Sequence, residues 1–362
     1  MVYTIPSLDN TPLEEDEVVE FVDHALDEIF DPEEDESRTK WREHLLVPCE
    51  EAWLGLLLVR LTRLERITFG QEDSQLMSDI FRKAARHQRP FHQTLPFPHL
   101  REVLVDVQWS KAWVGSDFLT PFFYLPAVRR ISGGPIGESD PEDLDKMSFG
   151  TSNSACPVRE FTITEAWWCR GMFDWLAACT ELEHITIVLS HHRDDLELPD
   201  SDMFKAPDFR NALLPFTGTL KTLQIEAHPR QTFHGDWWSN IADHTGPFGS
   251  FKEFAVLESL RIRHAHLGLQ STSGSICVTG GPLIDILPSS LRSLEILEID
   301  EDEYLNLVEE FSHLIQCRAS FPRLAQIILY VEEAAEDVFE PLKHEYGIAG
   351  INFQIDTKLP DW

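Results

Sequence analysis

One pattern of apolar and polar residues recurs along the chain: an aliphatic residue, two variable residues, an apolar residue, a variable residue and another apolar residue. Because side chains alternate between the two sides of a strand, the last two apolar residues of each copy would face one buried core. Copies begin at Leu64, Leu100, Val158, Leu182, Leu220, Leu257, Leu291 and Leu324, most of them 24 to 38 residues apart. Recurrence at this period predicts a solenoid, in which each strand belongs to one unit of a stacked array.

Helical patterns lie between the predicted strands, so each strand is reached from the previous one through a crossover. The predicted helices cover residues 49–61, 76–85, 172–178, 204–214, 283–287, 305–317 and 332–346, and a last strand ends near residue 355. Crossovers between parallel strands are nearly always right-handed. The strand pattern is typical of a leucine-rich repeat. We therefore predict an α/β fold, a right-handed leucine-rich-repeat-like solenoid (horseshoe) of irregular repeats.

The first 40 residues form a strongly acidic segment, with 14 Asp or Glu against Arg38 and Lys40. Apolar residues recur at helical spacing between residues 12 and 30, which predicts an acidic amphipathic helix. We expect this helix to cap the open end of the solenoid, with docking on another molecule as the alternative. The run at residues 31–37 is interpreted as a solvated linker. The predicted domains are an acidic helical cap and linker at residues 1–40 and a solenoid at residues 41–362.

Residues between the core positions would form two rows across the open face of the sheet. The first row is Arg66, Glu102, Arg130, Glu160, His184, Thr222, Ser259, Ser293 and Gln326, and the second is Thr68, Leu104, Ser132, Thr162, Thr186, Gln224, Arg261, Glu295 and Ile328. Solenoids bind partners on such extended surfaces. The candidate protein-binding residues are Arg66, Glu102, Arg130, Glu160, His184, Gln224, Arg261, Arg263 and Glu295. Pairing between neighbouring strands is the other explanation for the alternation of Arg with Glu.

Segments at residues 132–153, 191–202 and 228–250 interrupt the repeats and are predicted to be loop insertions. Insertions in repeat proteins map to one face, which often binds. The last segment contains Trp237 and Trp238, and tryptophan is enriched at interaction hot spots. We therefore add Trp237 and Trp238 as a candidate interaction site, with filling of the core beneath the insertion as the alternative.

The apolar helix and first strand, Glu51-Ala52-Trp53-x-Gly55-Leu56-Leu57-Leu58-x-x-Leu61-x-x-Leu64-x-x-Ile67, and the segment at residues 287–294 carry a family resemblance. They resemble the leucine-rich-repeat region of ascomycete F-box-type proteins, over about residues 41 to 355. The resemblance implies the substrate-binding part of a fungal ubiquitin-ligase adaptor, whose partner is a ubiquitin-ligase substrate. An F-box, which would bind the cullin adaptor, is not evident, because Ile5-Pro6 and the acidic helix offer no equivalent of its opening Leu-Pro-x-Glu step.

Composition excludes some classes of partner. Lys and Arg total 30 against 62 Asp and Glu, which gives a formal net charge of −32. A field of this sign repels phosphate backbones and anionic lipids, so we expect neither a nucleic-acid nor a membrane partner. The six cysteines are scattered, and no signal-peptide pattern opens the sequence. These features predict a cytoplasmic or nuclear protein.

Catalytic and cofactor motifs are missing: the sequence has no G-x-S-x-G elbow, P-loop, Rossmann fingerprint or H-E-x-x-H helix. We therefore predict a non-enzymatic protein without a cofactor or metal. The alternative is a small-ligand-binding or hydrolytic protein that uses His191, His192, Arg193, Asp194 and Asp195 or the Trp237/Trp238 insertion. His264 and His266 follow a predicted strand and are interpreted as surface residues.

Overall fold

The computed structural model forms two compact units, Met1–Leu64 with Asp73–His99, and Glu65–Glu72 with Leu100–Trp362. Within them it describes residues 15–47, 49–70, 75–106, 114–137, 156–166, 171–189, 204–227, 246–269, 281–331 and 336–357. The boundary at residue 40 and the capping role of the acidic helix stay predictions.

The first unit, called here the helical unit, contains α1 (Glu15–Ile29), α2 (Asp35–Leu46), α3 (Glu50–Arg60) and α4 (Gln75–Ala85). Trp41 of α2 is fully buried and lies edge-on to Phe30, with ring centroids 5.9 Å apart. A Cβ atom on Gly55 of α3 would lie 2.4 Å from the Trp41 ring. Glycine at this position therefore allows α3 to approach the tryptophan.

The acidic run at residues 31–37 is mostly exposed, as expected of a solvated linker, but only residues 31–34 connect α1 to α2, because Asp35, Glu36 and Ser37 belong to α2. The helix α2 begins at Asp35, and the positive end of its dipole favours acidic residues in the first turn. Both carboxylate oxygens of Glu34 lie 2.6 Å from Nζ of Lys83, whose side chain is buried. Burial raises the pKa of Glu34, but the hydrogen bonds and charge of Lys83 and the backbone hydrogen bond from Asp31 together outweigh it, and the net pKa is lowered. The run thus connects α2 to α4.

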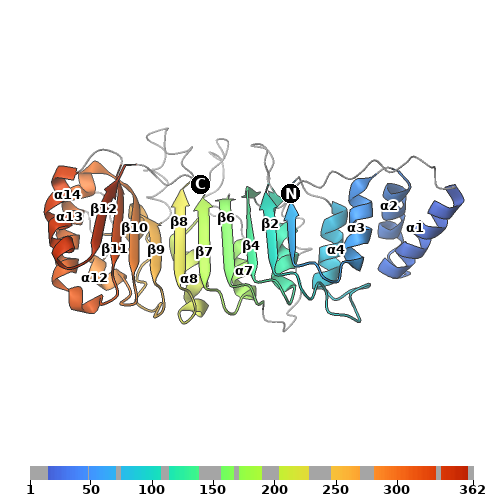
Figure 1. The fold of residues 1–362 in the computed structure, drawn as a ribbon, viewed down its shortest axis with the longest axis horizontal. Coiled ribbons are helices and arrows are strands. Elements are labelled where there is room, and N and C mark those ends of the chain that lie inside the picture. The colour runs from blue at the N-terminus through green and yellow to red at the C-terminus, as the bar shows by residue number, and fades with distance from the viewer. Residues whose placement is uncertain are drawn as a thin grey trace. The chain divides into compact units, whose positions relative to one another are not determined.

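The second unit is built around a parallel sheet in which the described residues form 12 strands (Figure 1). Most follow one another across the sheet in chain order: β1 (Arg66–Phe69), β2 (Glu102–Asp106), β4 (Arg130–Gly134), β6 (Glu160–Ala166), β7 (His184–Leu189), β8 (Thr222–Ala227), β9 (Ser259–Arg263), β10 (Ser293–Ile299), β11 (Gln326–Val331) and β12 (Asn352–Asp356). The short strands β3 (Val114–Gly115) and β5 (Ile136–Gly137) pair with each other, and β5 also pairs with β6. Parallel strands in chain order are the solenoid-like arrangement that the repeats predict.

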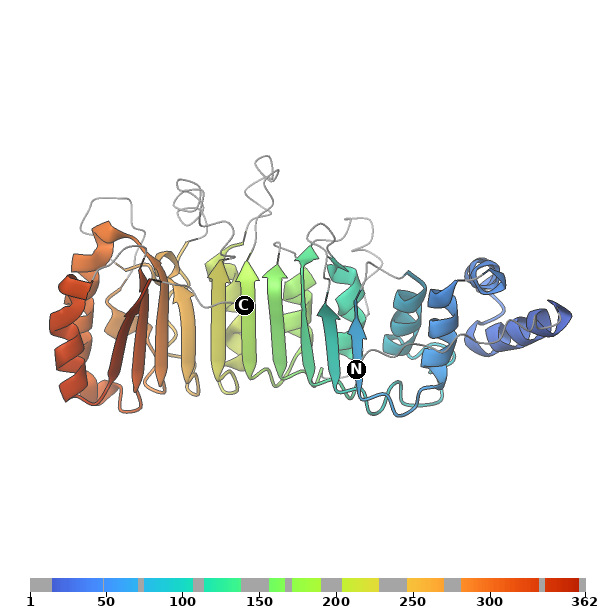
Figure 2. The same cartoon turned by 45° about the horizontal axis from the view of Figure 1, so that its top comes forward.

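Helices connect the strands of this sheet. They are α5 (Ser116–Leu119), α7 (Gly171–Ala178), α8 (Ala206–Leu213), α11 (His264–Leu267), α12 (Leu283–Ile286), α13 (Tyr304–Gln316) and α14 (Glu336–Ile348), with 3-10 turns η1 (Thr120–Tyr124), η5 (Leu214–Phe216), η6 (Glu301–Glu303) and η7 (Arg318–Ser320). The longer helices α7, α8, α13 and α14 lie on one face of the sheet (Figure 2). The opposite face, which no described helix covers, is called the open face.

The core of the second unit lies between the sheet and its helices. It is filled by the repeated apolar residues, which are almost completely buried: Leu100, Val103, Val158, Phe161, Leu182, Ile185, Leu220, Leu223, Leu257, Leu260, Leu291, Leu294, Leu324 and Ile327. Phe123 stacks on Trp175, with centroids 5.2 Å apart, and Trp175 Nε1 donates to Thr120 Oγ1 at 2.8 Å. Burial of each such side chain stabilises the fold by roughly 1.5–3 kcal/mol. The apolar repeat therefore defines the buried face of most strands in the sheet.

Part of the predicted insertion at residues 132–153 is instead strand, because β4 extends to Gly134 and β5 covers Ile136–Gly137. A Cβ atom on Gly133 would lie 2.6 Å from Cβ of Val105 on β2. Glycine is required here by close approach of neighbouring strands. The prediction of a loop is wrong for these residues, and residues 138–155 lie outside the described part of the chain.

Candidate functional site

Two rows of side chains cross the open face of the sheet, and they are the two rows predicted from the sequence. The parallel register aligns Arg66 with Glu102, Arg130, Glu160, His184 and Thr222 in the first row. The same register aligns Thr186 with Gln224, Arg261 and Glu295 in the second row. Members of both rows are partly or fully exposed, whereas the apolar residues between them face the core. The rows therefore form the accessible surface of the open face.

Four charged residues on β1, β2, β4 and β6 form what we call the arginine–glutamate ladder: Arg66, Glu102, Arg130 and Glu160. Arg66 pairs with Glu102, and Arg130 lies 3.4 Å from Glu102 through Nη1 and 2.7 Å from Glu160 through Nε. The hydrogen bond with Glu160 raises the pKa of Arg130. The side chains of Arg66 and Arg130 are 67% and 49% exposed. Exposed pairs contribute only about 0.2–1 kcal/mol each, so a partner could exchange them at little cost.

The middle of the open face carries uncharged hydrogen-bonding groups. Nδ1 of His184 lies 3.0 Å from Oγ1 of Thr222. Oγ1 of Thr186 donates to Oε1 of Gln224 at 3.3 Å. All four side chains are half-buried, which leaves part of each accessible. This region can donate and accept hydrogen bonds without separating an ion pair.

A group of charged residues on β8, β9 and β10 is much less accessible. This buried charge cluster contains Glu226, Arg261, Arg263, Glu295 and Glu298. Arg261 donates to Glu226 at 2.9 Å and to Glu295 at 2.7 Å, and Arg263 Nε donates to Glu298 at 2.8 Å. The side chains of Arg261, Arg263 and Glu226 are only 14%, 4% and 2% exposed. These charged side chains therefore pair with one another more than they contact solvent.

Burial shifts the protonation of this cluster. Desolvation raises the pKa of Glu226 to about 7, although Arg261 opposes the shift. Burial also tends to lower the pKa of Arg261, but the hydrogen bonds and charges of Glu226 and Glu295 outweigh it and the net pKa is raised. The hydroxyl of Tyr330 lies 3.5 Å from Glu295, and burial raises its pKa as well. Near neutral pH, Glu226 is consequently the titrating member of the cluster.

A backbone irregularity on β10 brings Glu298 into the cluster. The register with β11 shifts between Ile296 and Ile299, and Glu298 has a φ of 54°. Residues other than glycine rarely adopt this left-handed backbone conformation, and the strain costs roughly 1–3 kcal/mol of folding free energy. The hydrogen bond and ion pair that Arg263 makes with Glu298 help to offset this strain.

The structure divides the predicted binding residues between these regions. Arg66, Glu102, Arg130 and Glu160 form the ladder, and His184 and Gln224 lie in the middle of the open face. Arg261, Arg263 and Glu295 belong to the buried charge cluster. Sequence reasoning missed Glu226, although it follows Thr222 and Gln224 in the same alternation. It also missed Glu298, which strict alternation assigns to the core.

Other candidate residues lie outside the described part of the chain. These are Trp237, Trp238, His191, His192, Arg193, Asp194 and Asp195. Their roles in partner, ligand or hydrolytic chemistry stay predictions. Within the described residues, no group of three or more His, Cys, Asp or Glu side chains has a geometry that could hold a metal.

The interpretation of His266 as a surface residue is wrong. It is fully buried, and its ring centroid lies 5.5 Å from that of Phe248 and 5.8 Å from that of Phe204. Burial lowers its pKa well below the ordinary value, so the ring is neutral. The side chain of His264 is half-buried, and burial lowers its pKa too. Both residues lie in α11, which packs against β9 and β10.

Comparisons with known proteins concern the chain as a whole. The sequence profile of a family described as leucine-rich repeat domain matches residues 16–354. A search among curated proteins finds no significant match. A crystal structure of a Bacteroides fragilis protein shares 14% identity and a TM-score of 0.37, covering 87% of this chain and 85% of that chain. At this TM-score the structural likeness supports no inference. Among the described helices, none has the length and apolar character needed to cross a bilayer.

Proposed function

Because the chain belongs to the leucine-rich repeat domain family, we propose that it is a non-enzymatic protein-interaction module that binds a partner protein through its open face. The observation that carries this proposal is the row of accessible side chains from β1 to β8. Parallel strands lie about 4.8 Å apart, so the row presents a polar group at each strand step. Such an extended, regularly spaced surface suits a protein segment that lies across several repeats.

The contact region in this proposal is the arginine–glutamate ladder together with His184 and Gln224. Ladder side chains are accessible, and their mutual ion pairs are weak enough to be replaced by a partner. We propose that acidic groups of the partner bind Arg66 and Arg130, while its backbone or amide groups bind the uncharged middle. Arg261, Arg263 and Glu295 support this surface from within the buried charge cluster.

We further propose that the partner is a ubiquitin-ligase substrate and that the module acts in the cytoplasm or nucleus. This finer proposal rests on the resemblance of the repeat region to F-box-type proteins. Binding of the cullin adaptor is not part of it, because the sequence shows no clear F-box.

Quantitative affinity purification with mass spectrometry tests the proposal. The tagged chain and an Arg66→Ala/Arg130→Ala variant serve as baits in the same cells. The matched control is Lys252→Ala/Lys343→Ala, which also removes two half-exposed cations that have carboxylate neighbours, away from the open face. We expect the open-face variant to lose a reproducible partner by about tenfold, equivalent to about 1.4 kcal/mol, while the control keeps it.

Equal recovery of every protein by both variants would contradict binding through the ladder. Recovery of the partner in ubiquitin-conjugated form with the wild-type bait would support the finer proposal. If the partner lost by the open-face variant has no connection with ubiquitin ligases, the finer proposal is contradicted. The proposal of an interaction module is then still supported.

A further inference from the structure

An apolar groove lies between α1 and α3 within the helical unit. Phe21 of α1 stacks on Trp53 of α3, with ring centroids 6.2 Å apart and ring planes at 12°. Phe21 and Leu57 are nevertheless 55% and 51% exposed. Ala25, Ile29 and Leu56 line the floor of the groove and are buried. Large apolar side chains that remain exposed together are a mark of an interaction surface.

The composition of α3 makes this exposure unusual. Its sequence, EEAWLGLLLVR, is apolar around almost the whole helix. A helix of this kind is expected to be buried on every side. Leu56 and Leu58 are buried, whereas Leu54 and Leu57 are exposed beside Trp53. The exposed side of α3 therefore has the chemistry of a buried surface.

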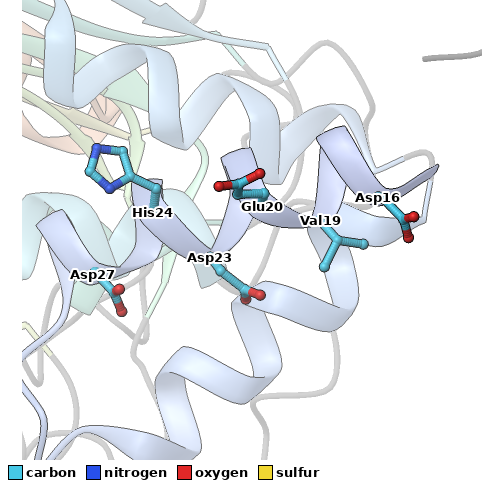
Figure 3. A pocket seen from close by; sticks show the side chains of 6 residues that line it. All are labelled: Asp16, Val19, Glu20, Asp23, His24 and Asp27. Atoms are coloured by element: carbon cyan, nitrogen blue, oxygen red, sulfur yellow. The ribbon is translucent and has the colours of Figure 1, made fainter. Parts of the chain in front are cut away.

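The face of α1 that points away from the groove is acidic. Figure 3 shows Asp16, Glu20, Asp23 and Asp27 projecting from this face. Asp23 and Asp27 pair with Arg42 and Arg38 of α2, each at 2.7 Å. Another set of acidic residues has no ion-pair partner among the described residues, and it comprises Asp16, Glu17 and Glu20 on α1 and Glu50 at the start of α3.

Of these carboxylates, Glu17 and Glu50 border the apolar groove. Glu17 precedes Phe21 by four residues, and Glu50 precedes Trp53 by three, so each lies one turn before an aromatic residue on the same helix face. The charged residues that line the groove itself, Glu28 and Arg60, pair with each other, so the uncompensated negative charge at its border comes from Glu17 and Glu50.

We propose that the groove between α1 and α3 binds a basic amphipathic helix of a partner protein. Helices dock in apolar grooves through residues spaced i, i+3, i+4 and i+7, which would contact Phe21, Trp53 and Leu57. Lys or Arg residues flanking those anchors would meet Glu17 and Glu50. The net charge of −32 further favours encounter with a basic partner. A second copy of this chain would bring two acidic borders together, so the charge argues against a dimer here.

Fluorescence anisotropy on the full chain tests this proposal with a fluorescein-labelled peptide of about 18 residues. The peptide contains only Leu and Lys, with Leu at i, i+3, i+4 and i+7, and forms about five helical turns. We expect Phe21→Ala/Leu57→Ala to weaken its binding by at least about tenfold. The control Leu305→Ala/Ile348→Ala removes two strongly exposed apolar residues of the second unit and should bind as the wild type does.

Charge is tested separately with Glu17→Lys/Glu50→Lys. We expect this variant to lose about tenfold in affinity, because its lysines repel those of the peptide. The control Glu301→Lys/Asp302→Lys changes the net charge equally on η6 of the second unit and should lose much less. Circular dichroism on each variant verifies that the helical unit is folded.

Three results would overturn the proposal. One is unchanged affinity in the Phe21→Ala/Leu57→Ala variant while its circular dichroism matches the wild type. Another is equal affinity for a peptide with Glu in place of every Lys. The third is a dimer in sedimentation experiments that the same groove variant dissociates, because the occupant would then be a second copy. The open-face variant Arg66→Ala/Arg130→Ala should leave peptide affinity unchanged, which separates this proposal from the binding role of the sheet.

Discussion

Arginine meets glutamate across neighbouring strands in two regions of the open face, but the two regions differ in depth. In the ladder, Arg66 and Arg130 are 67% and 49% exposed. In the buried charge cluster, Arg261 and Arg263 are 14% and 4% exposed. The pairs look alike in sequence, yet solvent screens only the first region effectively. The comparison indicates that the ladder is suited to exchanging partners and the cluster to holding the sheet together.

Removing one charge from the cluster should give the largest loss of stability. Arg261→Ala leaves Glu226 and Glu295 without the guanidinium that both of them contact. Breaking a buried pair in this way destabilises a protein by roughly 3–5 kcal/mol. Urea unfolding followed by circular dichroism should therefore show a large loss in the free energy of unfolding. A loss no larger than that of Arg66→Ala would show that the two regions do not differ.

The next largest effect should be a dependence of stability on pH, through Glu226 in the cluster. The pKa of Glu226 is raised to about 7 in the folded protein, from an ordinary value of 4.5. The folded state therefore binds this proton more tightly, and the stability it contributes is complete below pH 4.5 and is lost as the pH rises through 7. A shift of this size corresponds to about 3 kcal/mol.

The measurement compares wild type with Glu226→Gln, which keeps the shape and cannot titrate. From about pH 5 to pH 8, the wild type should lose more free energy of unfolding than the variant does. Parallel curves for the two proteins would contradict a raised pKa at Glu226. The comparison removes contributions from groups that both proteins share.

The smallest effect on stability is expected in the ladder. Arg130→Ala breaks two exposed pairs and should destabilise the protein by about 0.4–2 kcal/mol. Because salt screens exposed charges, the difference from wild type should shrink further in about 1 M sodium chloride. Urea unfolding at low and high salt provides the test. If Arg130→Ala lost as much free energy of unfolding as Arg261→Ala, and the loss persisted in high salt, the ladder and the cluster would not differ in their contribution to stability.

The strand register and the core were predictable because one apolar period governs them. Each copy places residues such as Leu223 and Leu260 in the core, and a register slip would expose them. The alignment of Arg66, Glu102, Arg130 and Glu160 follows from the same constraint. Helices such as α13 were predictable for a similar reason, since their apolar residues return at helical spacing.

Burial along the open face was not predictable in this way. Alternation predicts that Arg263 lies on the open face of β9. How far its side chain is buried depends on the residues around the end of that strand. Glu298 was missed because a β-bulge breaks the alternation, and a bulge has no apolar signature. The helix α2 was missed because few of its residues are apolar, and its acidic start matches the pattern of a solvated segment.

Site-specific photo-crosslinking tests the central claim, partner binding on the open face, most directly. A benzophenone side chain replaces Thr162 of β6, between the ladder and the uncharged middle, and in a second protein replaces Lys343 on the helix side. After irradiation in cells, mass spectrometry identifies the crosslinked proteins. The account predicts one reproducible protein crosslinked from position 162 and not from position 343. Crosslinking of a partner from position 343 alone would contradict it.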